Sequence, residues 1–131
     1  MIVLDRNAVR EKHFTIDVDP QNPYEPPAKG AEGLEQITWY HRPFTGHDSR
    51  RFSDSMMVMD KKGAQKFAAG TLQAEKLKAA TTKIENLGLK DGAPIRKLTD
   101  DLYDVIPAWI LEIASREINR SNAVDEEEEG N

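Results

Sequence analysis

The sequence predicts an α+β fold, mainly helical, in which short N-terminal strands are followed by about four helices. Three patterns indicate this fold. Apolar and polar residues alternate near the N-terminus, as in half-buried strands, and after residue 45 apolar residues recur every three or four positions, as in amphipathic helices. Prolines and glycines separate the two patterns. A length of 131 residues fits one globular domain, which we place at residues 1–121 with residues 1–12 as an arm.

Two short strands are expected, at residues 13–18 and 36–41, either as an antiparallel hairpin or as separate strands. Apolar residues at every second position share one face of each strand, with Ile37 and Trp39 on one side of the second. The connection at residues 19–35 contains four prolines and two glycines. Because proline lacks a backbone donor, neither strand nor helix can run through it. A loop of this length is either mobile or part of a binding surface.

The next pattern predicts a helix that begins near a cap at Asp48 or Ser49. Its apolar stripe has helical spacing and consists of Phe52, Met56, Met59, Gly63 and Phe67. Residues 50–60 remain open between helix and strand. The reason is that a run of apolar residues followed by Lys-Lys-Gly also fits a strand and a turn.

A further helix is predicted over residues 72–87, with Thr71 as its cap. Its apolar stripe comprises Leu77, Ala80, Ile84 and Leu87. Gly88 stands where a residue of left-handed conformation would end the helix, and residues 90–94 have the composition of a turn.

Two more helices are predicted before the C-terminus. Thr99 caps a short helix to about Val105, which acidic residues in the first turn favour through the helix dipole. The strongest apolar stripe predicts a last helix from Pro107 to about Arg120, and it consists of Ile106, Trp109, Ile110, Ile113, Ala114 and Ile118. Residues 122–131 include five consecutive acids and are expected to form a disordered tail, because like charges repel and no apolar burial offsets the chain entropy.

Charge is distributed unevenly along the chain. The formal net charge of −5 divides into −3 over residues 1–40, +5 over residues 41–90 and −7 over residues 91–131. A basic middle between acidic ends suits self-association between copies, or the steering of a charged partner. Charged helix faces that are simply solvated explain the same pattern equally well.

The composition argues against several kinds of chemistry. The absence of cysteine removes thiol nucleophiles, iron–sulfur clusters and disulfides, and it fits a reducing compartment. No apolar run approaches the ~20 residues of a membrane-spanning helix, so neither a membrane nor export is expected. The glycines lack the lysine that ends a phosphate-binding loop. No nucleophile with a base and no carboxylate pair stands out, so we expect no enzyme and no cofactor.

Imidazole and carboxylate groups are suitable metal ligands, and the candidates are His13, His41, His47 and Asp48. Their spacing matches no recurrent ligand pattern. We therefore expect them to be ordinary polar residues that hold no metal.

Seven residues are candidates for contacts with a partner or with a second copy: Trp39, Arg42, Arg50, Arg51, Lys61, Lys62 and Trp109. Four of the basic ones suit phosphate contacts in a small DNA-binding regulator, which is our third hypothesis. No aromatic residue interleaves with them to stack bases, so nucleic acid is not expected as the partner. A tryptophan in an apolar stripe is an interface anchor or, more often, a core residue.

Several segments resemble the tail assembly chaperones of long-tailed bacteriophages through their order and spacing. These segments are Trp39–Thr45, the predicted helix from Leu77 to Leu87, Gly88–Ile95, Leu98–Leu102, Ile106–Trp109 and the closing Glu126–Asn131. The resemblance covers about residues 36–131. Phe44 stands where a smaller aliphatic residue is expected, and residues 1–35 add little to the likeness.

The resemblance implies a non-enzymatic chaperone that binds the tape measure protein, keeps its apolar helices from aggregating and helps recruit tail tube subunits. It also implies action in the host cytoplasm, absence from the finished virion and a longer isoform made by translational frameshifting. A helical domain with apolar stripes and opposed charges can form a homo-oligomer around an extended client. The alternative is a structural component of the virion, such as a head–tail joining or tail-completion protein.

Overall fold

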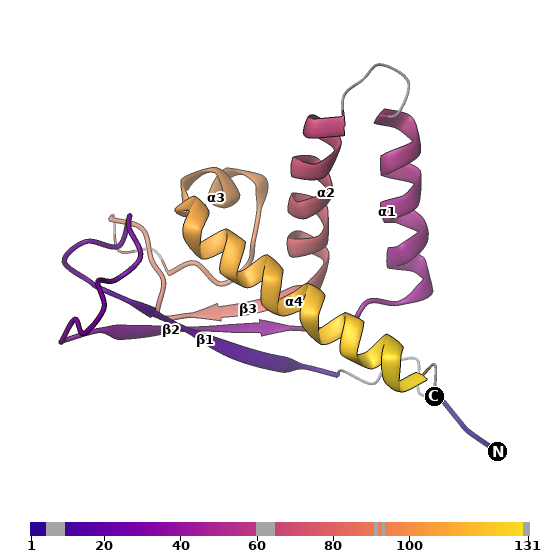
Figure 1. The fold of residues 1–131 in the computed structure, drawn as a ribbon, viewed down its shortest axis with the longest axis horizontal. Coiled ribbons are helices and arrows are strands. Elements are labelled where there is room, and N and C mark those ends of the chain that lie inside the picture. The colour runs from indigo at the N-terminus through magenta and orange to yellow at the C-terminus, as the bar shows by residue number, and fades with distance from the viewer. Residues whose placement is uncertain (5–9, 60–64, 91, 93, 130–131) are drawn as a thin grey trace.

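The computed structural model describes residues 1–4, 10–59, 65–90, 92 and 94–129, and for residues 54–59, 65–71 and 123–129 it describes the backbone alone. Within these residues, three strands and four helices follow one another along the chain (Figure 1). In order they are β1 (Lys12–Val18), β2 (Glu35–His41), α1 (Gly46–Met59), α2 (Gln65–Ala80), β3 (Thr81–Glu85), α3 (Asp100–Val105) and α4 (Ala108–Glu129). The fold is α+β, as the sequence predicts.

The strands form one antiparallel sheet in the order β1-β2-β3. Phe14 of β1 lies opposite Trp39 of β2, and Ile16 lies opposite Ile37. The two predicted strands therefore pair with each other and direct their apolar residues to one face.

The structure contradicts the helix predicted over residues 72–87 at both ends. α2 begins at Gln65, so Thr71 lies within the helix and is not its cap. α2 ends at Ala80, and the chain continues directly into β3. Thr81 and Thr82 are β-branched and favour extended backbone, while Ile84 is buried in the core. Because apolar residues three or four positions apart can belong to the end of a helix and the start of a strand, the stripe alone did not reveal this boundary.

Residues 94–96 run along the outer edge of β3. The N–H of Ile84 donates to the carbonyl of Arg96 at 3.1 Å, and the N–H of Ile95 donates to the carbonyl of Leu87 at 2.7 Å. Gly88, predicted to cap a helix, instead forms an isolated bridge with Pro94.

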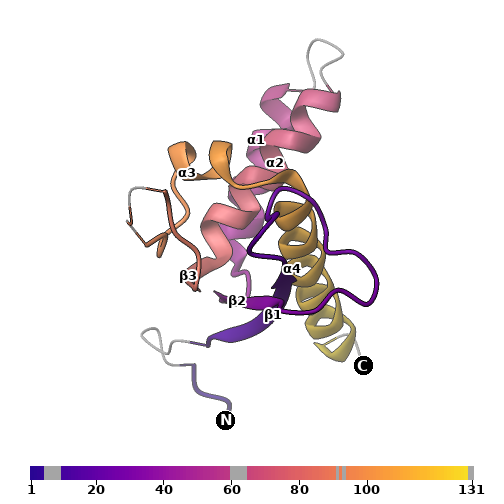
Figure 2. The ribbon, with the colours of Figure 1, turned by 90° about the vertical axis from the view of Figure 1, so that its left-hand side faces the viewer.

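Helices cover one face of the sheet and leave the other face open (Figures 1 and 2). α4 lies across the covered face and contacts β1 and α2. The side chains between these elements form the core, and the largest that are fully buried are Trp39, Leu77, Ile84, Ile110 and Ile118. The open face carries polar residues such as Thr15 and Lys83, both exposed.

α1 and α2 pack against each other as a helical hairpin that projects away from the sheet (Figure 1). Residues 50–59 are helical, which decides between the two alternatives left open for this segment. The helix begins at Gly46, so the cap predicted at Asp48 or Ser49 is wrong by about one turn. Residue 60 lies outside the described part of the chain, as do Lys61, Lys62 and Gly63.

The two C-terminal helices begin where the sequence predicts. Thr99 caps α3, and its Oγ1 accepts a hydrogen bond from the N–H of Leu102 at 3.4 Å. α4 begins at Ala108, directly after Pro107.

The end of α4 differs from the prediction. The helix extends past Arg120 to Glu129, so the backbone of residues 122–129 is helical where a disordered tail was predicted. Asn122 Oδ1 accepts a hydrogen bond from the N–H of Phe44 at 2.9 Å, which ties the helix to the sheet at this point. Glutamate is a good helix former, and extending an existing helix needs no new nucleation. Residues 130–131 lie outside the described part.

Candidate functional site

The helical hairpin joins the sheet through a polar network at the junction of β2 and α1. The N–H of Thr45 donates to Asp48 Oδ2 at 2.9 Å, and the N–H of Asp48 donates to Thr45 Oγ1 at 3.4 Å. Arg42 donates to both oxygens of the Asp48 carboxylate, at 2.7 and 3.0 Å. Thr45 and Asp48 thus form a capping box, and Arg42 fixes that box to the end of β2.

The Arg42–Asp48 pair stays charged at neutral pH. Asp48 is buried, and the hydrogen bond from Arg42 lowers its pKa from 3.8 to about 2 against the opposing effect of burial. The same hydrogen bond raises the pKa of Arg42. Groups that hold their charge so firmly are poor proton donors or acceptors at neutral pH, so this pair suits a positioning role.

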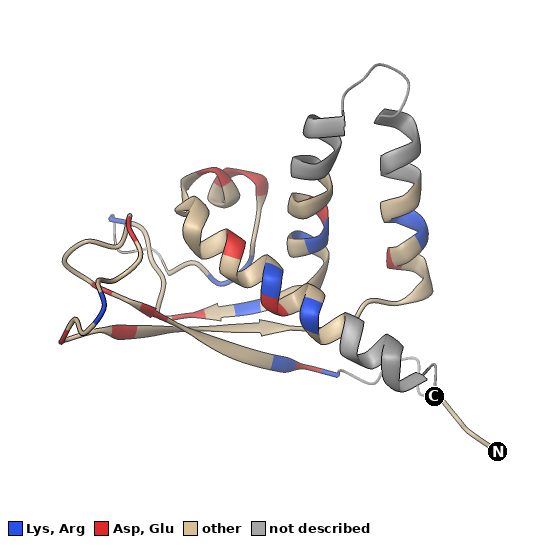
Figure 3. Cartoon of the chain, in the orientation of Figure 1, with Lys and Arg blue, Asp and Glu red and all other residues tan. Residues whose placement is uncertain are grey.

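A second set of charges links the hairpin to α3. Arg51 Nη2 lies 2.7 Å from Glu75 Oε2 across the hairpin, and Lys78 Nζ lies 3.2 Å from the other oxygen of Glu75. Lys78 also pairs with Asp100 in the first turn of α3, and this contact is the largest cause of the raised pKa of Lys78. Figure 3 shows basic and acidic positions on the lower turns of both α1 and α2.

Aromatic side chains hold the base of the hairpin. The rings of Phe44 and Phe52 meet edge to face with centroids 5.1 Å apart, and Phe52 is buried. Lys76 Nζ lies 5.9 Å from the centroid of Phe52, within the range of a cation–π contact. Packing and ion pairs therefore orient the hairpin relative to the sheet.

The structure separates the candidate contact residues into different environments. Arg42 is engaged with Asp48, and Arg51 is exposed but paired with Glu75. Arg50 is exposed on α1. Lys61 and Lys62 lie outside the described residues, so the predicted four-residue basic surface cannot be placed as a whole.

Neither tryptophan is an exposed anchor. Trp39 is 0% exposed, and its indole Nε1 donates to Thr81 Oγ1 at 2.9 Å. Trp39 is therefore a core residue that a partner of the folded chain cannot reach, which corrects its inclusion among the contact residues. Trp109 is partly buried, and its Nε1 donates to the carbonyl of Pro23 at 3.0 Å, which fastens the loop at residues 19–34 onto α4.

The histidines considered as metal ligands do not converge. His41 is buried on the core side of the sheet beside Phe14, whereas His13 lies on the open face beside Tyr40. Burial, and then the charge of Lys12, lower the pKa of His41. Among the residues that the structure describes, no three His, Cys, Asp or Glu side chains are placed to hold a metal ion.

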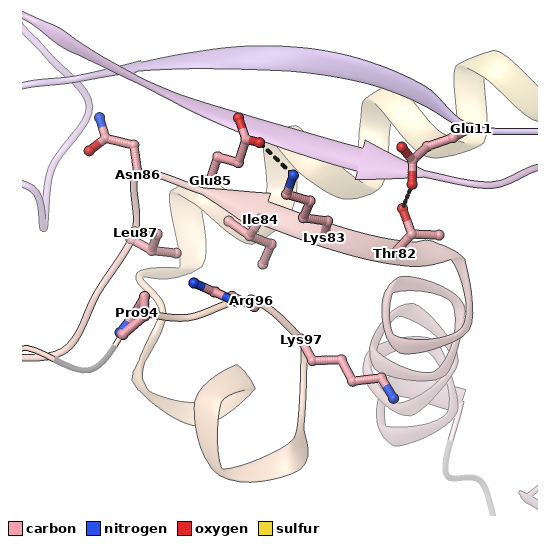
Figure 4. A pocket seen from close by; sticks show the side chains of 10 residues that line it. All are labelled: Glu11, Thr82, Lys83, Ile84, Glu85, Asn86, Leu87, Pro94, Arg96 and Lys97. Atoms are coloured by element: carbon pink, nitrogen blue, oxygen red, sulfur yellow. Dashed lines mark hydrogen bonds and ion pairs between the residues drawn. The ribbon is translucent and has the colours of Figure 1, made fainter.

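A hollow of about 730 Å³ lies beside β3 (Figure 4). Two of its charged side chains pair with each other, with Lys83 Nζ 2.7 Å from Glu85 Oε1. Thr82 Oγ1 donates to Glu11 Oε2 at 2.6 Å, and Arg96 and Lys97 add two further basic side chains to the lining. The mutual hydrogen bond raises the pKa of Lys83 and lowers that of Glu85. Both groups stay charged at neutral pH, so the Lys83–Glu85 pair is a poor proton donor or acceptor.

Sequence reasoning missed the hollow and the polar network at the base of the hairpin. The hollow depends on β3, which was predicted as helix. The network was detectable in part, since Thr45 and Asp48 stand three residues apart as in a capping box. The contact of Arg42 with Asp48 depends on the geometry of the turn between β2 and α1. Periodic sequence patterns do not predict the geometry of such a turn.

Comparisons with known proteins identify no relative: no protein-family model, curated protein or solved structure matches this chain. None of the helices in the described ranges is long and apolar enough to cross a membrane.

Proposed function

We propose that the chain is a tail assembly chaperone of a long-tailed bacteriophage, which binds the tape measure protein and helps recruit tail tube subunits. The observation that carries the proposal is the helical hairpin. α1 packs against α2 and rises away from the sheet, so the outer side of the hairpin faces away from the rest of the fold (Figure 1). A long helical client can pack along such a surface by helix-on-helix contacts.

The construction of the hairpin supports a binding role. The Arg42–Asp48 pair, the Arg51–Glu75 pair and the ring contact of Phe52 hold its base in one orientation. A surface that is ordered before the client arrives loses less conformational entropy on binding. Several copies on one client would add their weak contacts into a stable complex.

The proposal places the protein in the host cytoplasm during assembly and outside the finished virion. A structural component of the virion is the competing function. Mass spectrometry of purified particles separates the two, because a chaperone is absent from the particles and a structural component is present in fixed copy number.

Binding can be tested by co-expressing the tagged chain with the candidate tape measure protein, which we expect as a very long helical open reading frame directly downstream. We expect the two to co-purify, and we expect Arg50→Glu, on the exposed side of α1, to reduce the recovered client. Arg116→Glu makes the same charge reversal at an exposed position of α4 and serves as the control. The test includes the form extended by frameshifting, and if neither form retains the client, the proposal is rejected.

A further inference from the structure

The segment Met1–Leu4 exposes four consecutive apolar side chains. Their exposed fractions are 116, 93, 75 and 89% in chain order. Soluble proteins rarely leave a contiguous apolar run in water unless a partner covers it. Ile and Val also favour extended backbone, so this segment is suited to form a strand.

β1 is an edge strand of the sheet, with β2 on its inner side. From His13 to Val18, its outer edge receives no backbone hydrogen bond from any residue that the structure describes. An open edge of this kind presents unpaired N–H and C=O groups that can pair with an added strand. β3 differs, because residues 94–96 already cover its outer edge.

The pattern of side chains on β1 fits an apolar neighbour. Phe14 lies on the core side of β1 and is only partly buried, although its ring stacks against Trp39 with centroids 6.3 Å apart. In an added strand, alternate residues point to opposite faces, so Ile2 and Leu4 share one side. With these two directed to the core side, they would extend the apolar face beside Phe14.

We propose that Met1–Leu4 of one copy adds as a fourth strand to the outer edge of β1 in a second copy. Among the residues that the structure describes, neither Met1–Leu4 nor the outer edge of β1 from His13 to Val18 pairs with another strand. Exchange between two copies gives a strand partner to the segment and to the β1 edge at the same time. A reciprocal exchange gives a closed two-fold dimer. Two β1 edges are then covered and two apolar segments are buried.

This inference deepens the proposed function, in which several copies gather on one client, and rests on it for its role. It concerns contacts between copies and needs no client. Strand exchange can therefore fail while client binding succeeds, and client binding can fail while strand exchange succeeds.

The first test compares the mass of the purified full chain with that of two double variants by light scattering. Ile2→Asp with Leu4→Asp places charges in the exchanged strand. Leu89→Asp with Val105→Asp makes the same chemical change at two other exposed apolar positions and is the control. We expect dimers of the wild type and the control, and a rise of about 100-fold or more in the dimer dissociation constant of the first variant, because two buried apolar side chains are lost.

Circular dichroism and the urea midpoint show that each variant is folded. Wild-type protein that stays monomeric at high micromolar concentration overturns the proposal. An unchanged dimer of the Ile2→Asp, Leu4→Asp variant overturns it as well.

The second test uses the absence of cysteine in the natural chain. Untagged protein that carries Val3→Cys is mixed with tagged protein that carries His13→Cys, Thr15→Cys or Asp17→Cys. Each mixture is then oxidised. These three positions are exposed and alternate along β1, so they share the face that Val3 would join. Ser53→Cys, on an exposed position of α1, is the control partner.

We expect a disulfide between the two populations for at least one position on β1, above the level of the Ser53→Cys control. A disulfide that forms only when both cysteines are in one chain would show that the segment folds onto its own β1, and it would overturn exchange between copies. No disulfide at any of the three positions would overturn it as well.

Discussion

Asp48 connects the end of β2 with the start of α1 through one carboxylate. It accepts hydrogen bonds from Arg42 at the end of β2 and from the N–H and hydroxyl of Thr45 at the start of α1. Its carboxylate is almost completely buried, so each of these hydrogen bonds replaces water. This residue therefore controls how the proposed binding surface is attached to the sheet.

Asp48→Asn removes the charge while keeping the size of the side chain. A folded-state pKa of about 2, below the ordinary 3.8, means that the ionised group stabilises the fold above pH 4 and that this stability is lost as pH falls from about 4 to 2. We expect the variant to lose about 2 kcal/mol of unfolding free energy at pH 7 and to show a flatter pH dependence below pH 4. Urea titrations from pH 7 to 2 measure both effects.

Glu112→Gln is the control for this measurement, since Glu112 is exposed on α4. A loss below 0.5 kcal/mol for Asp48→Asn would mean that the polar network does not fix the hairpin, since surface changes away from such networks usually stay within about ±0.5 kcal/mol.

Two neighbouring threonines stand where α2 changes into β3, and their side chains have different roles. Thr81 is buried and accepts the hydrogen bond of the Trp39 indole, whereas Thr82 donates to Glu11 at the surface. Both are β-branched, so a substitution by valine leaves the strand propensity of each position nearly unchanged.

Thr81→Val leaves the buried N–H of Trp39 without an acceptor. We expect a loss of about 1–3 kcal/mol in unfolding free energy, against less than about 0.5 kcal/mol for Thr82→Val. Urea unfolding of the pair of variants measures the difference. Equal losses would show that the hydrogen bond from Trp39 to Thr81 does not stabilise the fold.

The loop between β1 and β2 is held at Trp109. Trp109→Phe keeps an aromatic ring but removes the hydrogen bond to the carbonyl of Pro23. We expect the loop to open more often, so that trypsin cleaves after the exposed Lys29 several-fold faster, as measured by mass spectrometry of timed digests. Tyr103→Phe, which removes a hydroxyl elsewhere in the fold, should leave the cleavage rate unchanged. An unchanged rate for Trp109→Phe would show that the hydrogen bond does not hold the loop.

Local patterns predicted β1, β2 and the starts of α3 and α4, but not β3, the starts of α1 and α2, or the ends of α2 and α4. The alternation around Phe14 and Ile37 identifies β1 and β2, and Thr99 identifies the start of α3, because these signals lie within a few residues. The end of α2 at Ala80 depends on the pairing of β3 with β2, which is a tertiary contact. α4 continues past Arg120 to Glu129, and in this stretch Asn122 contacts Phe44, which is distant in sequence.

At the scale of the whole molecule, the sheet, α4 and the hairpin form a body with two different surfaces. The open face of the sheet is polar, whereas the hairpin projects from the covered face (Figures 1 and 2). The basic middle segment predicted from the sequence maps mainly to the hairpin and β3, yet much of its charge is used in pairs such as Lys78–Asp100 and Lys83–Glu85. Charge counts reveal such a segment but not its pairing, because pairing depends on the folded geometry.

The proposed function requires that this molecule bind another polypeptide. The most direct measurement is the soluble fraction of the tape measure protein when it is expressed with this chain, and when it is expressed with an unrelated acidic protein of similar size. We expect soluble tape measure protein in a complex with this chain and aggregated protein in the control. Equal solubility in the two, with no complex recovered, would contradict it.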